Sequence, residues 1–228
     1  MAVVGAGPAG CMAARYAARA GASTLLLEEH SAVGWPVQCA GLLGTEALAE
    51  AELPGGPYIL QEVRGARIFS PGGSCLGFRA PSSRAFVIDR RLFDRALALE
   101  AVRAGAELHL RSGVRRMGRV EGGRLLALSD GSEIQARVVI SAEGVRARLA
   151  RQAGIAPPQR ILSGAQFLLP FAVEDPERVE VHLGEAPGLF AWVIPVGDGQ
   201  ARIGLCAEDG ALLRLEAFIR KERISERI

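Results

Sequence analysis

A glycine-rich motif near the beginning of the chain constrains the fold more than any other feature of the sequence. Residues 5–10 are Gly-Ala-Gly-Pro-Ala-Gly, which matches the pattern G-x-G-x-x-G. The motif follows the apolar run Ala2–Val4 and precedes an alanine-rich stretch, residues 11–20, that ends at Gly21. This order predicts a buried strand, a tight glycine turn and a helix with a glycine at its C-terminal end.

The next apolar segment, Ser23–Leu27, has the continuous hydrophobicity of a strand that is buried on both faces of a parallel sheet, and Glu28 closes it. The segment therefore completes a βαβ unit. In such a unit Gly5 permits the tight turn, Gly7 lets the backbone approach a pyrophosphate, and Gly10 lets helix and strand pack closely. Glu28 would accept hydrogen bonds from ribose hydroxyls and would repel a 2′-phosphate. The motif therefore favours FAD or NAD over NADP, and leaves the choice between the first two open.

Further patterns predict two blocks of secondary structure. In the first, Asp89 can cap a helix whose buried face carries Phe93, Leu97 and Ala101. The rest of this block consists of a short helix, strands and hairpin turns, at residues 45–52, 107–110, 121–123, 129–131 and 136–141. From about residue 160 the pattern changes to antiparallel strands followed by an amphipathic helix, at residues 165–171, 178–183, 190–196, 201–206 and 211–223.

Composition excludes several classes of protein. Hydrophobic residues make up 49% of the chain and charged residues 23%, so the chain can bury a large core and is not a disordered segment. The 27 basic and 25 acidic residues nearly cancel, so we expect no nucleic-acid partner. No apolar run approaches the ~18 residues of a membrane span. The four cysteines and three histidines lack disulfide or ligand spacing, which favours the cytoplasm and no metal site.

Four segments resemble motifs of known flavoproteins. Residues 87–94 (VIDRRLFD) resemble the D-R-x-x-F-D segment of proteins related to the aromatic hydroxylases, and residues 138–144 resemble their second flavin fingerprint. Residues 34–41 (GWPVQCAG) contain P-V-x-C-A-G, which is typical of the geranylgeranyl reductase family. Residues 188–195 (GLFAWVIP) are similar to that family's Y-x-W-x-F-P substrate motif. The four motifs occur in family order over essentially the whole chain, so the chain resembles the geranylgeranyl reductases.

The resemblance implies FAD as the cofactor and an α/β fold in two domains. We expect a Rossmann-like, three-layer FAD-binding domain of the aromatic-hydroxylase type at residues 1–159, with a β-hairpin insertion around 60–85 that contacts the substrate domain. An antiparallel substrate domain would occupy residues 160–228. Family members continue into a strand with a Gly-Asp fingerprint, which this chain does not reach, so we expect it to be incomplete at its C-terminus.

The family's activity is the saturation of geranylgeranyl double bonds on lipids or pigments. Reduced flavin delivers a hydride to one alkene carbon and a proton goes to the other, while the protein supplies orientation and excludes water. The resemblance further implies an external reductant, either NAD(P)H or a ferredoxin-like protein. It also implies cytoplasmic protein in peripheral contact with the inner face of the membrane.

The motifs assign roles to individual residues. The expected cofactor contacts are Gly5, Gly7, Ala9, Gly10, Glu28, Cys39, Ala40, Gly41, Leu42, Arg90, Val114, Glu143 and Gly144. Of these, Cys39 is the candidate catalytic residue, because it would lie against the flavin and could tune the flavin or assist protonation. Phe190, Trp192 and Pro195 are the expected substrate contacts, since Phe190 and Trp192 alternate on one strand and face the same side.

The sequence is also compatible with other functions. Residues 190–195 also resemble the W-x-W-x-I-P signature of flavin-dependent halogenases, which need a lysine beside the substrate, and Lys221 is the only lysine in the chain. A flavin-dependent monooxygenase is a further alternative, because a shared fold does not determine the reaction. A non-enzymatic fragment that cannot retain FAD is the third.

Overall fold

The structure is a computed structural model, and it describes residues 1–171 and 173–221. The chain divides into two compact units: unit 1 contains residues 1–38 and 90–159, and unit 2 contains residues 39–89 and 160–228. The second segment of unit 2 starts at residue 160, where the sequence places the start of the substrate domain. Unit 2 differs from the expected domain in also including residues 39–89. The last two residues of the helix expected at 211–223 lie outside the described part of the chain.

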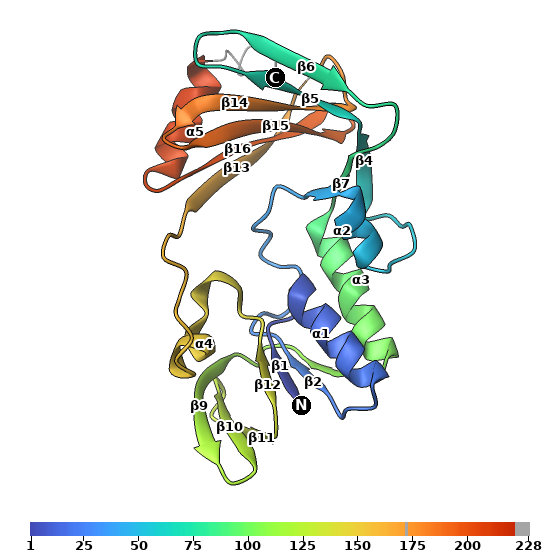
Figure 1. Ribbon diagram of the computed structural model, residues 1–228, viewed down its shortest axis with the longest axis vertical. Helices are drawn as coiled ribbons and strands as arrows, with labels where there is room; N and C mark the ends of the chain where they lie inside the picture. The colour runs from blue at the N-terminus through green and yellow to red at the C-terminus, as the bar shows by residue number, and fades with distance from the viewer. Residues whose placement is uncertain (172, 222–228) are drawn as a thin grey trace. The chain divides into compact units, whose positions relative to one another are not determined.

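Unit 1 is built on a four-stranded parallel sheet (Figure 1). Its strands are, in spatial order, β12 (Val139–Ser141), β1 (Ala2–Val4), β2 (Leu25–Leu27) and β8 (Glu107–His109). Helices α1 (Pro8–Arg19) and α3 (Arg90–Arg103) pack against each other and form one layer. The helix predicted after Asp89 is confirmed, and its three expected core residues Phe93, Leu97 and Ala101 are buried.

An antiparallel meander forms the third layer of unit 1. It consists of β9 (Val114–Val120), β10 (Gly123–Leu128) and β11 (Glu133–Ala136), and is followed later in the chain by the short helix α4 (Arg148–Gln152). Alternate side chains of the parallel sheet, including Val4 and Leu27, pack against Leu126 of the meander in one buried cluster. Helices, parallel sheet and meander together confirm the predicted three-layer fold.

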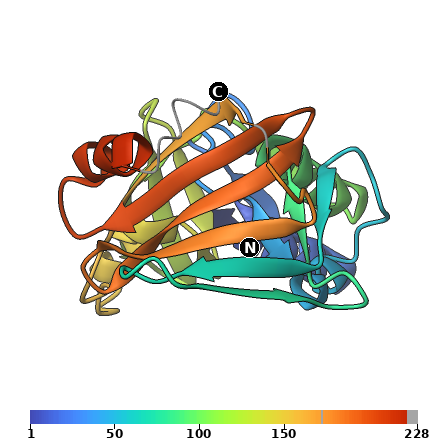
Figure 2. The ribbon, with the colours of Figure 1, turned by 90° about the horizontal axis from the view of Figure 1, so that it is seen from above.

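Unit 2 contains a six-stranded sheet (Figure 2). The strands are, in spatial order, β13 (Ser163–Pro170), β16 (Gln200–Ala207), β15 (Leu189–Gly197), β14 (Arg178–Ala186), β5 (Gly65–Phe69) and β6 (Cys75–Arg79). All pairs are antiparallel except β5 with β14, which are parallel. This pairing is the reason that residues 39–89 join the second unit. Helix α5 (Ala211–Lys221) covers one face of the sheet and buries Leu215 and Phe218 there.

A small three-stranded sheet lies beside the six-stranded sheet within unit 2. It is formed by β3 (Leu42–Gly44), β7 (Ala85–Ile88) and β4 (Ile59–Val63), and the short helix α2 (Thr45–Glu50) follows β3. Side chains of the two sheets share one buried cluster: Val63 and Val87 from the small sheet pack with Val179 and Ile194 from the large one. We refer to this group as the Ile194 cluster.

Candidate functional site

The glycine motif has the geometry of an anion-binding turn. Gly5 directly follows β1 and has a φ of +100°, a conformation that favours glycine, and a Cβ atom there would overlap the carbonyl oxygen of Ala142. A Cβ atom at Gly10 would overlap the carbonyl oxygen of Gly5, so the close approach of α1 to β1 requires this glycine. At Gly7, by contrast, a Cβ atom would meet nothing within 4 Å. Gly7 is also the N-cap of α1, where no side chain caps the helix. The first N–H groups of α1 are thus available to an anion.

Glu28 lies at the end of β2 and is held by the same turn. Its Oε2 accepts a hydrogen bond from the backbone N–H of Ala6 at 2.9 Å, and its Oε1 accepts one from the N–H of His30 at 2.9 Å. The Nδ1 atom of His30 also lies 2.6 Å from Oε1. A carboxylate oxygen can accept about two hydrogen bonds, so Oε2 retains capacity for one more donor. The carboxylate is therefore fixed in orientation and can still bind a ribose hydroxyl.

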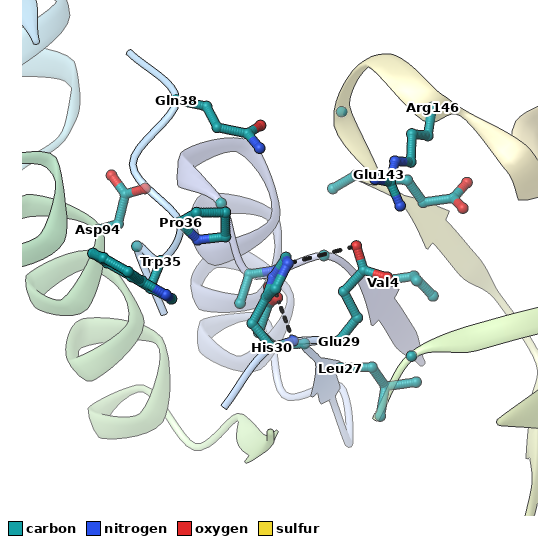
Figure 3. Close-up of a pocket in the computed structure, with 18 of the residues that line it drawn as sticks. Val4, Leu27, Glu29, His30, Trp35, Pro36, Gln38, Asp94, Glu143 and Arg146 are labelled. Carbon is teal, nitrogen blue, oxygen red and sulfur yellow. Dashed lines mark hydrogen bonds and ion pairs between the residues drawn. The ribbon is translucent and has the colours of Figure 1, made fainter. Parts of the chain in front are cut away.

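A cavity of about 350 Å³ in unit 1 brings many of the predicted cofactor contacts together. Seven of them line it: Gly5, Gly7, Glu28, Arg90, Val114, Glu143 and Gly144. Trp35 and Asp94 lie on one side of the cavity and Arg146 lies on the other (Figure 3). Ala9 and Gly10, in the first turn of α1, support the turn without lining the cavity.

Three arginine side chains bring positive charge to a cavity that is also lined by four carboxylates, those of Glu28, Glu29, Asp94 and Glu143. Arg90 is held by Asp94 through two hydrogen bonds, from Nε at 2.8 Å and from Nη2 at 2.9 Å, which fixes the plane of its guanidinium group. Arg146 and Arg148 also line the cavity, and sequence analysis did not select them. Between them Ala147 has a φ of +40°, an uncommon conformation for a residue other than glycine. The resulting turn brings both arginines to the same cavity.

Glu143 has a structural partner in addition to its place at the cavity. Its Oε2 accepts hydrogen bonds from the hydroxyl group of Ser141 at 2.7 Å and from the backbone N–H of Leu149 at 2.8 Å. The second contact satisfies an N–H in the first turn of α4. One oxygen of Glu143 is therefore committed to holding the Ser141–Leu149 segment, and its role as a cofactor contact stays a prediction.

Cys11 lies beneath the glycine turn and is fully buried, with its Sγ atom 3.1 Å from the carbonyl oxygen of Ala6. Burial, together with the nearby charges of Asp94 and Glu28, raises the pKa of the Cys11 thiol to about 12. The folded protein therefore keeps this proton in a pH range, from about 9 to about 12, in which the unfolded chain loses it. Stability should accordingly fall as the pH rises through this range.

This burial predicts a large difference in reactivity between two cysteines. At pH 8, iodoacetamide should modify the exposed Cys75 in the native protein and should modify Cys11 only after unfolding in denaturant. Mass spectrometry of peptides taken at successive times measures both rates in one sample. Equal rates for the two cysteines in the native protein would contradict the buried position of Cys11.

The other predicted flavin contacts, Cys39, Ala40, Gly41 and Leu42, belong to unit 2. The Sγ atom of Cys39 accepts a hydrogen bond from the N–H of Gly41 at 3.4 Å, and Gly41 has a φ of +74°. Ala40 packs against the Ile194 cluster, and so does Trp192. The loop predicted to face the flavin and the strand predicted to face the substrate thus both pack against the Ile194 cluster of unit 2.

Trp192 is held across three strands of the sheet. Gly204 on β16 pairs with Trp192 on β15 and, on its other side, with Gln166 on β13. The indole lies over Gly204, where a Cβ atom would come within 2.7 Å of the ring atom Cζ2. The indole N–H donates a hydrogen bond to Oε1 of Gln166 at 3.0 Å. The absent side chain at Gly204 therefore makes room for the ring, and Gln166 fixes its orientation.

The three predicted substrate contacts do not share one face. Phe190 and Trp192 alternate on β15 on the face opposite α5, and their rings meet edge to face at 6.3 Å. Pro195 has the parity of Ala191 and Val193, which face α5, and it pairs with Ala201 of that same core. The side chain of Pro195 is buried, so Phe190 and Trp192 alone form the expected wall.

Lys221 lies at the end of α5, where its Nζ atom forms an ion pair with Glu185 at 2.5 Å. In the described part of the chain, no group of three or more His, Cys, Asp or Glu side chains could hold a metal ion. None of the helices described here is long and apolar enough to cross a membrane.

Comparison with known proteins agrees with this site. Residues 1–157 match the model of the FAD dependent oxidoreductase family. The chain belongs to this family of FAD-dependent enzymes, and the prediction of FAD as the cofactor is confirmed.

Particular relatives specify the class of enzyme more narrowly. The chain is 35% identical over 215 residues to the digeranylgeranylglycerophospholipid reductase of Methanoculleus marisnigri, a match that covers 89% of this chain and 54% of that protein. A solved structure of a geranylgeranyl bacteriochlorophyll reductase-like protein from Thermoplasma acidophilum is 30% identical, with a TM-score of 0.89 over 99% of this chain and 62% of the other. The predicted resemblance to the geranylgeranyl reductases is confirmed, and the chain spans little more than half the length of these relatives.

The halogenases are similar in fold only. The structure of halogenase PltM in complex with phloroglucinol and FAD has a TM-score of 0.77 over the whole chain, but only 16% of residues are identical. A halogenase needs a lysine beside its substrate. The described chain offers no such lysine beside Trp192, because the only lysine, Lys221, is paired with Glu185 at the end of α5.

The cavity of unit 1 fits the adenosine diphosphate portion of FAD. The uncapped N-terminus of α1 and the open backbone at Gly7 suit a diphosphate group, and the arginines add positive charge. The buried carboxylate of Glu28, held by Ala6, suits ribose hydroxyls and disfavours a phosphate there. The residues present thus match the chemical groups of the cofactor.

Proposed function

We propose that the protein reduces carbon–carbon double bonds of geranylgeranyl groups on lipids or pigments. The observation that carries this proposal is the Ile194 cluster, against which both Ala40 of the predicted flavin loop and Trp192 of the predicted substrate wall pack. The names of the relatives, which are reductases of geranylgeranyl compounds, support the same activity.

Residues of unit 1 would bind the cofactor in this function. The glycine turn and the N-terminus of α1 would hold the diphosphate, and Glu28 would bind the ribose. Arg146 and Arg148 would add charge-assisted hydrogen bonds to phosphate oxygens, for which a guanidinium group is well suited. FAD, when bound and reduced, supplies the hydride for the double bond.

Residues of unit 2 would bind the prenyl chain. An isolated alkene chain offers no polar group, so its binding depends on buried apolar area, at about 25 cal/mol per Å². The face opposite α5 provides Trp192 and Phe190, with Leu183 paired across from Phe190. Leu183 and Phe190 are exposed, as a wall that contacts a ligand requires. Cys39 would assist protonation of the second alkene carbon, a role that an unchanged turnover in Cys39→Ala with bound flavin would exclude.

The proposal includes two further partners. An external reductant, NAD(P)H or a ferredoxin-like protein, must recharge the flavin after each double bond. Because the substrate chain is attached to a lipid, we also propose peripheral contact of the protein with the inner face of the membrane. Flotation with vesicles of the substrate lipid tests this contact.

The activity itself can be tested on the flavin-loaded protein. Under anaerobic conditions with dithionite as reductant, a geranylgeranyl glycerophospholipid should gain one molecule of hydrogen per double bond, which mass spectrometry detects. Trp192→Ala should raise the KM for the lipid about ten- to a hundredfold, because the large apolar contact of the indole is lost. Leu213→Ala on α5, where the side chain is 71% exposed, is the matched control and should change nothing. If the wild-type protein holds flavin and leaves every double bond intact, the proposal is wrong.

A further inference from the structure

We propose that Arg202 is a positioning residue that holds the loop of residues 39–42 in the conformation used beside the flavin. The inference rests on the proposed function, in which this loop contacts the cofactor. Arg202 lies on β16, more than 150 positions from the loop in sequence, and no motif selects it.

Arg202 joins two segments through a single nitrogen. Its Nη1 atom donates a hydrogen bond to the carbonyl oxygen of Ala40 at 2.7 Å and another to the carbonyl oxygen of Ile88 at 3.0 Å. The backbone N–H of Ile88 in turn donates to the carbonyl oxygen of Gly41 at 2.7 Å. The loop, the end of β7 and the guanidinium group thus form a closed set of hydrogen bonds.

Gly41 makes this arrangement possible. A Cβ atom at Gly41 would overlap Nη1 of Arg202 and would come within 2.6 Å of the carbonyl oxygen of Ile88. Gly41 also has a positive φ, a conformation that other residues rarely adopt. The glycine of the P-V-x-C-A-G motif is therefore required in this structure for the approach of Arg202, in addition to any requirement of the flavin.

The position of Arg202 links the loop to the substrate wall. On β16, Arg202 is two residues from Gly204, over which the indole of Trp192 lies. Arg202 also pairs with Ile194 of the Ile194 cluster. Hydrogen bonds from a charged donor are stronger than neutral ones, and the guanidinium group offers several donors in a fixed plane. Arg202 consequently fixes the loop relative to the sheet that carries Trp192.

The first test needs no cofactor. In the flavin-free protein, the rate at which iodoacetamide modifies the half-buried Cys39 reports how well the folded loop shields this thiol. Arg202→Met retains the apolar stem and removes the donors, so Cys39 should react about tenfold faster or more, as expected from the loss of one or two charged hydrogen bonds. Arg202→Lys, which can donate to only part of this set, should give an intermediate rate. Arg214→Met on α5 is the control and should leave the rate unchanged.

Other cysteines separate a local effect from unfolding. The half-buried Cys206, which lies in unit 2 together with Cys39, must keep its wild-type rate in the variant, and the exposed Cys75 must react as in the wild type. If Arg202→Met also speeds the reaction of Cys206, Arg202→Lys decides the question by the same measurements. An unchanged rate at Cys39 in a folded Arg202 variant would overturn the inference.

The second test uses the flavin-loaded protein. Arg202→Met should lower kcat more than it raises KM for the prenyl lipid, and it should shift the absorption maxima of the bound flavin. A spectrum and kcat identical to the wild type would also overturn the inference. A wild-type protein without reductase activity would instead refute the proposed function, while faster labelling of Cys39 would still show that Arg202 holds the loop.

Discussion

Gly10→Ala is expected to destabilise unit 1 by about 3 kcal/mol and to abolish FAD binding. The new Cβ atom would overlap the carbonyl oxygen of Gly5 and would lie 3.2 Å from Cβ of Ala142. Neither neighbour can move freely, because Gly5 directly follows β1, an interior strand of the sheet, and its backbone shapes the turn. Helix α1 must then shift away from β1, and the N–H groups at its N-terminus move with it.

Gly7→Ala is the matched control, because its Cβ atom would meet no protein atom within 4 Å. This variant should unfold at the wild-type temperature. Its affinity for FAD should nevertheless be lower, since the methyl group occupies space at the diphosphate site. Thermal unfolding and FAD titration by flavin fluorescence measure the two effects. Gly10→Ala should lower the Tm by about 6–12 °C, at 2–4 °C per kcal/mol for a chain of this size. A Gly10→Ala protein with the wild-type Tm would contradict the contact described here.

Phe218→Ala should cost about 3–5 kcal/mol of the free energy of unfolding of unit 2. The ring is completely buried where α5 packs on the six-stranded sheet, in the same cluster as Ile203 and Leu205. It also meets the ring of the buried His182 edge to face at 4.9 Å. Removing it leaves a cavity in the only helix-covered core of this unit in the described chain.

The two tryptophans allow unit 2 to be followed by itself, because Trp35 lies in unit 1 and Trp192 in unit 2. In a Trp35→Phe background, the fluorescence of Trp192 during urea unfolding should show the loss caused by Phe218→Ala. Leu213→Ala, on the exposed side of the same helix, should leave the free energy of unfolding within about 0.5 kcal/mol of that of the parent protein. A loss of similar size in both variants would mean that α5 is not anchored by Phe218.

Local patterns were sufficient to predict most individual elements. The βαβ unit follows from the glycine motif, because few other arrangements place glycines at the turn, at the diphosphate and at the contact of helix and strand. The strand expected at 178–183 corresponds to β14, and the strand expected at 201–206 corresponds to β16. Each is slightly longer than predicted. Here alternation of side chains and a Gly-Asp-Gly turn determine the structure locally.

Pairing between distant segments could not be predicted in this way. Nothing in the residues of β5 specifies that it lies parallel to β14, more than 100 positions later, because register depends on faces that only the folded sheet defines. For the same reason the domain expected at residues 1–159 loses residues 39–89 to unit 2.

The candidate site shows the same division. Motifs predicted seven residues of the cavity, because each belongs to a local pattern that binds a nucleotide. Arg146 and Arg148 reach the cavity through the positive φ of Ala147, for which the sequence gives no signal. Arg202 contacts the Ala40 loop only after the sheet has formed, and an isolated arginine on an alternating strand predicts a solvent-exposed side chain.

The interleaved order of the two units has a consequence during synthesis on the ribosome. Strand β5 is made about 100 residues before the strand β14 with which it pairs. At about 5–20 residues per second, it waits roughly 5–20 s with an unsatisfied backbone edge. The side chains of Val63 and Val87, which are buried in the Ile194 cluster of the complete fold, wait with it for Val179 and Ile194. Nascent chains halted after β6 has left the ribosome and before β14 is made should therefore recruit chaperones that recognise apolar segments.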